Sequence, residues 1–537
     1  MNATVRDIKF GDATPLDLQK SWAPIYSQPG VIDRAQIASE VASFLAAMQK
    51  SLATNEFVPE GEKLWKSTFS QAGSATSGLT YYDLELGAKF LYPVLTPLRN
   101  ETPRVSGRGG IQANWRAVTG VNTGALRIGV SAGNRGGVQS VSTQDYTAAY
   151  RGFGLETNVD FEAEYAGRGF DDIRAIAAKV GLEATMIGEE MLILGGNTSM
   201  NLGTTPTPSA TGAITGGSLA AATYSVICVA LSFDAMVNGS VAGGIQASIT
   251  RTNADGSSDT FGGGAARKSG SGTATVASGT AGSITASVTP VAGACGYAWF
   301  WGAAGSELLG AITSINSVAI TGTATGTQTA TSLPAADNST NSLVFDGILT
   351  QILKSGSNAY VNALATGTAG VGTPLTSDGS GGIAEIDAAL KDRWDNYRLS
   401  PDTIWVNSQE ALNISKKILQ GNSNAAQRFV FDSRQDSLGG GVMVRSYLNR
   451  FSMGGAKTLD IRIHPNMPAG TIMMTSRSLP YPVSGVANVL QMRMRQDYYQ
   501  IEWPLRSRKY ESGVYADGVL QCYFPPAFAV INNIANG

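Results

Sequence analysis

Residues 161–196, FEAEYAGRGFDDIRAIAAKVGLEATMIGEEMLILGG, are the stretch that decides the fold. Its periodicity predicts a helix over residues 170–194, because apolar side chains recur at helical spacing on a single stripe. That stripe consists of Ile173, Ile176, Val180, Ala184, Ile187, Met191 and Leu194. Asp171 and Asp172 place negative charge in the first turn, and Gly195-Gly196 ends the helix. At about 1.5 Å per residue the helix spans roughly 36 Å, which is long for an ordinary domain.

A strand is predicted just before this helix, at residues 154–165 (GLETNVDFEAEY). Its alternation puts the carboxylates of Asp160, Glu162 and Glu164 on one face and apolar side chains on the other. The simplest interpretation is a polar outer face. Paired carboxylates also suit acid–base or divalent-metal chemistry, and they can pair with arginines of a neighbouring subunit.

Further upstream, residues 103–144 form a glycine-rich basic segment. It contains nine glycines and no acidic residue or lysine. Its net charge of +5 comes from Arg104, Arg108, Arg116, Arg127 and Arg135. A segment of this composition does not build a core. We therefore expect an extended hairpin that reaches away from its own domain toward something it contacts.

Downstream of the helix, the composition changes sharply between residues 201 and 340. These 140 positions hold eight charged residues, whereas the other 397 positions hold 72. Short runs of alternating polarity lie between turn signals, for example TYSVICVAL (223–231) and GSITASVT (282–289). In the first run the side chains of Tyr224, Val226, Cys228 and Ala230 share one face. These patterns predict an inserted all-β sandwich domain. Its segment VTPVAGACGYAWFWG (288–302) resembles strands of immunoglobulin-like modules.

The sequence on both sides of this insertion predicts a mixed α+β host. Residues 33–53 predict an amphipathic helix that opens with a capping-box spacing. After the insertion, a helix over 383–397 is followed by the strand TIWVN (403–407) and by another helix that ends at Gly421. The C-terminal hundred residues predict mainly strands, such as VLQCYF (519–524).

The composition excludes several classes of chemistry. The chain has 537 residues, a net charge of −2 and one histidine, His464, which we expect in a turn. A single histidine nearly removes His-dependent triads and His-rich metal sites. The three cysteines, Cys228, Cys295 and Cys522, lie too far apart in sequence to suggest a disulfide framework or a zinc site. We expect no cofactor and no metal. No signal peptide or membrane span is visible.

Two motifs invite an enzymatic interpretation. GVSAG (129–133) matches a nucleophile elbow around Ser131, with His464 as the available base and Asp460 to orient it. The residues that follow form a poor helix, so we interpret the match as chance. GGGAARKS (262–269) resembles a phosphate-binding loop, but Arg267 occupies the position that needs glycine, and we expect a loop tip instead.

A basic cluster lies near the C-terminus. Arg506, Arg508 and Lys509 stand beside Trp503 and Tyr510, a mixture that could contact phosphates without sequence preference. The surrounding strand pattern favours an ordinary solvated face. No constellation of residues therefore indicates catalysis, and the long helix, the arginine-rich segment and the neutral insertion are typical of a protein that assembles.

In order and spacing, these elements resemble the major capsid protein of tailed double-stranded-DNA bacteriophages, which has the Hong Kong ninety-seven fold. The resemblance rests on YYDLELGAKFLYPVLTPLRNETPRV (81–105), on the helix segment 161–196, on LSPDTIWVNSQEALNISKKIL (399–419) and on GVYADGVLQCYFPPAFAVIN (513–532). It covers all of the chain except the insertion.

The resemblance implies an α+β capsid fold with an inserted sandwich domain. It assigns an N-terminal arm with helices to 1–80, the passage from the arm into an extended loop to 81–153, a peripheral domain with strand and spine helix to 154–200, the insertion to 201–340, an axial domain to 341–440 and remaining axial and peripheral strands to 441–537.

The function that the resemblance implies is structural. Subunits would form pentamers and hexamers of an icosahedral virion shell, assembled in the bacterial cytoplasm around double-stranded DNA that they contact without sequence preference. Scaffold, portal and decoration proteins are the expected partners, with no membrane. The arginines of the extended loop would meet carboxylates of a neighbour, with Asp160, Glu162 and Glu164 as candidates. The insertion would project outward.

The resemblance also bears on maturation. Because the sequence begins at Met1, we expect no removal of an N-terminal scaffold region. Because the loop 103–144 has no lysine, we expect no Lys–Asn cross-link from it. The rival interpretations are an encapsulin-like compartment, a tail-tube or adhesion protein, and a serine hydrolase acting through Ser131.

Overall fold

The computed structural model describes residues 89–121, 128–167, 171–420, 443–455 and 457–535. The chain divides between Lys89 and Phe90 into two compact units, and all that follows concerns the second. The helix predicted at 33–53, the arm at 1–80, Arg127 and the helix end at Gly421 lie outside the described residues.

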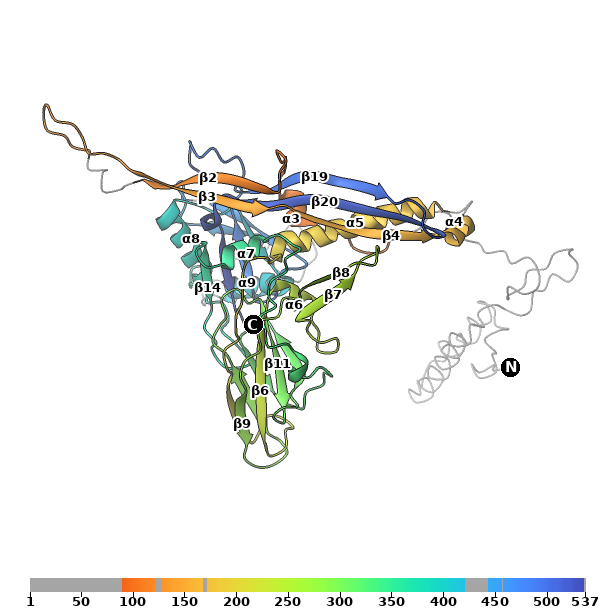
Figure 1. Cartoon of the computed structure of the whole chain (residues 1–537). Coiled ribbons are helices and arrows are strands. Elements are labelled where there is room, and N and C mark those ends of the chain that lie inside the picture. The colour runs from red at the N-terminus through yellow and green to blue at the C-terminus, as the bar shows by residue number, and fades with distance from the viewer. Residues whose placement is uncertain (1–88, 122–127, 168–170, 421–442, 456, 536–537) are drawn as a thin grey trace, which may run out of the picture. The chain divides into compact units, whose positions relative to one another are not determined.

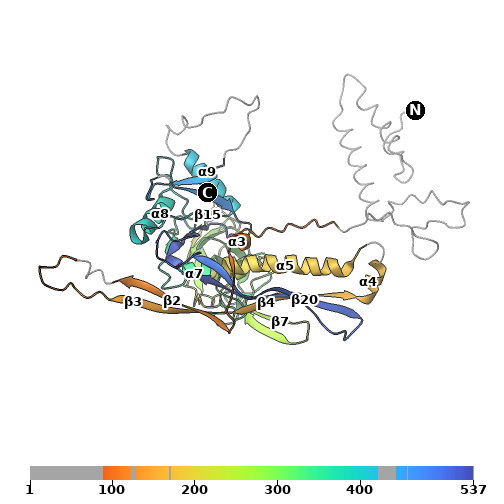
Figure 2. The same ribbon diagram turned by 90° about the horizontal axis from the view of Figure 1, so that it is seen from above.

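One part of the structure is a long helix packed on a four-stranded sheet (Figures 1 and 2). The helix is α5 (Ile173–Gly195), and the short helix α3 (Pro97–Glu101) lies against it. The sheet has the order β1-β19-β20-β4, with β1 parallel to β19 and the other pairs antiparallel. Its strands are β1 (Arg104–Ser106), β4 (Arg151–Asp160), β19 (Leu490–Glu502) and β20 (Lys509–Cys522).

Helix α5 matches the predicted helix, with two differences. It begins at Ile173 because the side chain of Asp172 accepts a hydrogen bond from the Ala175 amide (3.1 Å), so Asp172 is the N-cap rather than a residue of the first turn. Its buried face carries small and polar side chains such as Gly181 and Glu189, while Val180 of the apolar stripe remains 37% exposed. The buried face is small at Gly181 because the helix lies close to the sheet there: a Cβ at Gly181 would lie 3.1 Å from Thr157.

A second sheet of six strands holds most of the C-terminal half. Its order is β14-β21-β18-β15-β17-β16. The strands are β14 (Tyr360–Ala363), β15 (Thr403–Val406), β16 (Ser446–Asn449), β17 (Lys457–Ile463), β18 (Ile472–Thr475) and β21 (Ala529–Asn532). Helices α7 (Ile348–Leu353), α8 (Ala384–Tyr397) and α9 (Ser408–Gln420) and the 3-10 turn η5 (Pro525–Ala527) accompany them. The described residues thus form several sheets with helices packed on them, and the predicted α+β class is confirmed.

The segment 201–340 is built almost entirely of strands. One sheet has the order β12-β11-β6-β9, a second β13-β10-β5, and β7 and β8 form a separate hairpin. The elements are β5 (Ser209–Ala213), β6 (Ala222–Leu231), α6 (Phe233–Asn238), β7 (Ser248–Thr252), β8 (Ser258–Gly262), β9 (Gly272–Val276), β10 (Ser283–Ser287), β11 (Gly296–Gly302), β12 (Leu308–Thr313), β13 (Ser317–Ile320) and the 3-10 turn η3 (Ala330–Ser332). The helix α6 differs from the all-β prediction; it follows Ser232, and Phe233 is buried at its start.

Strand β6 is buried on both faces. Val226, Cys228 and Ala230 lie in the core that the two larger sheets share, as the predicted alternation requires. The alternate residues Ile227, Val229 and Leu231 lie in a second cluster with α6 and β11. From Ser225 onward this strand therefore has no solvent face, which explains why residues 226–231 are all apolar.

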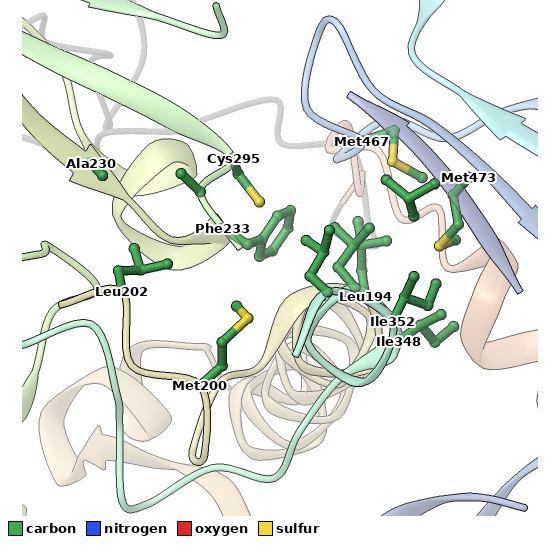
Figure 3. Close-up of a cluster of buried hydrophobic side chains, with 14 of the residues drawn as sticks. Leu194, Met200, Leu202, Ala230, Phe233, Cys295, Ile348, Ile352, Met467 and Met473 are labelled. Carbon is green, nitrogen blue, oxygen red and sulfur yellow. The ribbon is translucent and has the colours of Figure 1, made fainter. Parts of the chain in front are cut away.

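The core continues without interruption from this segment into the host (Figure 3). Phe233 of α6 packs beside Leu194 at the end of α5, and Met473 of β18 belongs to the same cluster. Across this junction Asn316 and Asn533 are joined by two hydrogen bonds: the Asn316 backbone amide donates to Asn533 Oδ1 at 2.8 Å, and Asn533 Nδ2 donates to Asn316 Oδ1 at 3.0 Å. The segment 201–340 is therefore tied to the host by packing and by buried hydrogen bonds.

Candidate assembly surfaces

A long antiparallel hairpin projects from the sheet that carries α5 (Figure 1). It consists of β2 (Gln112–Val121) and β3 (Val141–Ala149), paired from Gln112↔Ala149 to Val121↔Val141. At its base the Trp115 ring stacks on Tyr146 at 5.7 Å and meets Tyr523 edge-on at 5.9 Å. These aromatic contacts fix the base of the hairpin to the body, while most of its side chains are exposed.

The hairpin exposes an unusual number of large aliphatic side chains. They are Ile111 (78% exposed), Val118 (66%), Val121 (47%), Ile128 (83%), Val130 (51%), Val138 (90%) and Val141 (54%). Single exposed apolar residues are normal, but seven within the segment 111–141 favour a surface that a partner covers.

The five predicted arginines have different surroundings. Arg116 lies opposite Asp145 in the hairpin and forms a bidentate pair with it (2.6 and 2.9 Å), which raises the pKa of Arg116 and lowers that of Asp145. Arg108 and Arg135 are exposed and have no ion pair within the described part of the chain. Arg127 lies outside the described residues.

Arg104 is placed in β1, outside the hairpin, and its contacts lie within its own chain. It donates to Glu189 of α5 at 2.7 Å and to Asp497 at 2.7 Å. Burial lowers the pKa of Arg104, but the hydrogen bond to Asp497 and the charge of Glu189 outweigh this effect and raise it overall. The guanidinium of Arg104 thus joins β1 to the long helix. An intersubunit contact for Arg104 stays a prediction.

Glu189 is the centre of a buried polar cluster. Its fully buried carboxylate accepts hydrogen bonds from Arg99 (2.8 Å), from Arg104 and from the Tyr498 hydroxyl. Burial, followed by the charge of Glu189 and the hydrogen bond to it, raises the pKa of Tyr498 to about 12. Three segments of the chain therefore meet on one carboxylate of α5. Sequence analysis missed this cluster because its members are up to hundreds of positions apart.

The neighbouring Glu190 connects the same helix to the only histidine. Glu190 Oε1 lies 2.6 Å from His464 Nε2, and both side chains are fully buried. The Asn466 amide donates to His464 Nδ1 (3.1 Å), so Nε2 carries the proton that is shared with Glu190. Glu190 also accepts the amides of Leu98 and Arg99. His464 does begin a turn, as predicted, but its role is to anchor this turn to α5.

The predicted strand face of three carboxylates is wrong. Strand β4 ends at Asp160, and residues Phe161–Gly167 form helix α4. Alanine and glutamate favour a helix there over the apparent alternation. Glu162 and Glu164 therefore do not share a strand face with Asp160.

The carboxylates meet the basic cluster of the β19–β20 turn instead. Arg508 lies 2.6 Å from Glu162, and Lys509 lies 3.4 Å from Asp160. Glu164 Oε2 is buried without a hydrogen-bond partner among the described residues. A role for these carboxylates toward a neighbouring subunit stays untested, and two of them have cationic partners in their own chain.

Replacing Asp160 and Glu162 together by Asn and Gln tests their role. Because both pairs are exposed, we expect the free energy of unfolding to fall by no more than about 1 kcal/mol. We also expect assembled particles to form in the same yield as in the wild-type protein, measured by sedimentation. A loss of particles with unchanged stability would instead support an intersubunit role for Asp160 and Glu162.

The two motifs of enzymes lie in unsuitable surroundings. Ser131 is exposed between β2 and β3, without the strand–turn–helix that a nucleophile elbow needs, and accepts a hydrogen bond from Asn134 (2.6 Å). His464 is buried against Glu190, and Asp460 pairs with Arg462. Residues 262–269 are not an exposed loop tip as predicted, since Ala265, Ala266 and Ser269 are buried. No described helix is long and apolar enough to span a membrane.

Comparisons with known proteins found matches among solved structures. No family model and no curated protein matches the chain. The capsid of Myoviridae phage XM1 aligns with 84% of this chain and 97% of its own at 10% identity and a TM-score of 0.38. The capsid of the native GTA particle aligns with 85% of this chain and 96% of its own at 10% identity and a TM-score of 0.40. A structure from Mycobacterium phage Bobi aligns with 85% and 95% at 8% identity and a TM-score of 0.37.

Proposed function

We propose that this chain is the major capsid subunit of a tailed double-stranded-DNA bacteriophage. In this role it forms pentamers and hexamers that close an icosahedral shell around the DNA. It acts by assembly and not by turnover. Its expected place is the virion, after assembly in the bacterial cytoplasm.

The β2–β3 hairpin is the observation that carries the proposal. It exposes seven large aliphatic side chains and at least two arginines with no ion pair in the described residues, Arg108 and Arg135. Within the part of the chain that the structure describes, these apolar side chains stay exposed to water, which is unfavourable. A second copy that covers them removes them from water, and repetition around a closed ring makes many weak contacts sufficient.

The long helix supports the proposal because buried side-chain contacts hold it firmly to its surroundings. Glu189 and Glu190 fasten α5 to β1, to the β19 strand and to the turn at His464. A helix fixed in this way suits a subunit that makes contacts at both of its ends. Scaffold, portal and decoration proteins, and packaged DNA contacted without sequence preference, are the partners that this role requires.

The test of the proposal is negative-stain electron microscopy of the purified chain, expressed alone and together with a scaffold protein. We expect capsomer rings or closed icosahedral shells. Shells that copurify with nucleic acid favour the phage capsid over an empty protein compartment. A strictly monodisperse monomer in both preparations would contradict the proposal.

Substituting Val118 and Val138 by Asp tests the hairpin directly. Each valine that is covered in the assembly contributes about 1.5 kcal/mol, so each substitution lowers the contact's equilibrium constant roughly tenfold. We expect the double variant to remain folded by circular dichroism while assembled particles disappear from sedimentation profiles. Ile214→Asp is the matched control, because Ile214 is 53% exposed outside the hairpin. Equal loss of particles in this control would show that the hairpin side chains do not contribute specifically to assembly.

Denaturing gels test the nature of the contacts. Asn, but no lysine, occurs in the segment 103–144, and the three cysteines are buried and free. We expect assembled particles to dissolve into a band of single chains without reducing agent. A ladder of multimers would show a covalent link and contradict this expectation.

A further inference from the structure

A cleft lies on the face of the first sheet that α5 does not cover. Thr157 of β4 and Val514 of β20 point toward Gly181 of α5. Because successive strand residues point to opposite faces, Glu156 and Tyr515 lie on the other side, and both line the cleft. The cleft has a volume of about 640 Å³, which is enough for a small organic molecule.

Two tyrosine rings form the floor of the cleft. Tyr499 of β19 pairs with Tyr515 of β20 in the sheet, and their ring centroids lie 6.0 Å apart. The Tyr515 ring lies over Gly154 and Gly513, where a Cβ would come within 2.5 Å of it. Only glycine leaves room for the ring at these positions. Trp503, which is 39% exposed, extends the aromatic surface of the cleft.

The opposite wall of the cleft is the β7–β8 hairpin of the segment 201–340. This hairpin lies beside the first sheet in both views (Figures 1 and 2), and its residues 251–255 and Asp259 line the cleft. Arg251 pairs with Asp259 at 3.1 Å and donates to Asn253 Oδ1 at 3.0 Å. The charges of Arg251 and Asp259 therefore balance each other, and the carboxylate of Asp255 is the charge of this wall that remains.

Two carboxylates of the cleft, one from each wall, form no ion pair in the described part of the chain. Glu156 of the sheet accepts a hydrogen bond from the Tyr515 hydroxyl. Asp255 of the hairpin accepts one from the Ser257 amide at 2.9 Å, and the charge of Arg506 acts on it without an ion pair. Three carboxylates and one guanidinium thus give the lining residues a net charge of −2.

Both of these carboxylates act on the same aromatic ring. Burial raises the pKa of Tyr515, and its hydrogen bond to Glu156 and, more weakly, the charge of Asp255 raise it further. The hydroxyl of Tyr515 is therefore protonated and neutral at physiological pH. An ammonium group above this ring is attracted both by the face of the ring and by the two carboxylates.

We propose that the cleft between the β7–β8 hairpin and the first sheet binds an aliphatic polyamine. Its ammonium groups pair with Glu156 and Asp255, and the methylene chain between them lies on the rings of Tyr499 and Tyr515. A neutral saccharide also stacks on aromatic rings, but it leaves both carboxylates without a counter-charge. The cleft lies within one chain, so the inference does not depend on the proposed function.

Isothermal titration calorimetry of the full chain with spermidine tests the inference. At low ionic strength, where charge pairs are least screened, we expect saturable binding of one spermidine per chain. Triethylene glycol is a chain of similar length without charge, and we expect no binding of it. The same titrations are repeated with variants whose folding is checked by circular dichroism.

The variant with Glu156→Gln and Asp255→Asn removes both charges and keeps the shapes of the side chains. We expect its affinity for spermidine to fall about tenfold. Tyr499→Leu keeps an apolar floor without the π face and should weaken binding about threefold. The matched control is Asp395→Asn with Asp460→Asn, two side chains outside the cleft that are 48% and 65% exposed. We expect this control to bind spermidine as the wild type does.

Three outcomes would overturn the inference. The first is a wild-type chain that shows no saturable binding of spermidine. The second is equal affinity of the cleft variant and the control variant, because spermidine would then bind elsewhere through general attraction to acidic groups. The third is binding of maltose but not of spermidine, with loss of maltose binding in Tyr499→Leu, which would identify a saccharide site. None of these outcomes decides whether the chain forms shells.

Discussion

Replacing Glu189 by Gln is expected to destabilise the subunit by about 3–5 kcal/mol. The substitution keeps the shape of the side chain but removes the buried charge that faces Arg99, Arg104 and Tyr498. The two guanidinium groups then stay partly buried without their shared counter-charge, and breaking a buried pair costs this amount. Urea unfolding of the dissociated subunit, followed by tryptophan fluorescence, measures the change in the free energy of unfolding.

Glu183→Gln on the same helix is the matched control. Glu183 interacts with Lys179 at 4.0 Å and with Tyr92, near solvent. We expect its loss to cost about 1 kcal/mol or less. If Glu189→Gln were no more destabilising than this control, the buried cluster would not hold α5 in place.

Glu410→Gln is expected to stabilise the subunit at pH 8 and to leave it nearly unchanged at pH 5. Glu410 of α9 is fully buried and has two hydrogen-bond partners in the described residues, Asn413 and the amide of Gly470. Burial raises its pKa from 4.5 to about 7. The folded state therefore binds this proton more tightly than the unfolded state, so stability is greatest below pH 4.5 and falls as the pH rises through 7.

The expected size of this effect is about 3 kcal/mol, because one pKa unit corresponds to about 1.4 kcal/mol. Other groups titrate in the same window, so the useful quantity is the difference between wild type and variant at each pH. Thermal unfolding at pH 5, 6, 7 and 8 gives this difference. A constant difference across the range would mean that Glu410 does not change its protonation on folding.

The sequence predicted those parts of the fold that local patterns control. The end of α5 at Gly195, the strand β6 and the helix α8 follow from spacing and from glycine or proline signals within a few residues. The hairpin followed from an unusual composition. The α+β class followed from the order of such elements.

The candidate site was predicted less well, because its contacts join distant segments. The sequence near Arg104 does not indicate that Arg104 pairs with Glu189. The sequence near His464 does not indicate that His464 hydrogen-bonds to Glu190. At residues 161–165 two local rules conflicted, since the polar–apolar alternation suggested a strand and the glutamate–alanine content favoured a helix. The helix begins where the pairing of β20 with β4 ends, at Asp160.

Strand β21 has a consequence for biosynthesis. It lies inside the six-stranded sheet, between β14 and β18, and its residues Ala529, Val530 and Ile531 are completely buried. The strands on either side of it are made earlier, so this sheet stays incomplete on the ribosome until residue 532 has emerged. Nascent or prematurely terminated chains thus lack a finished core.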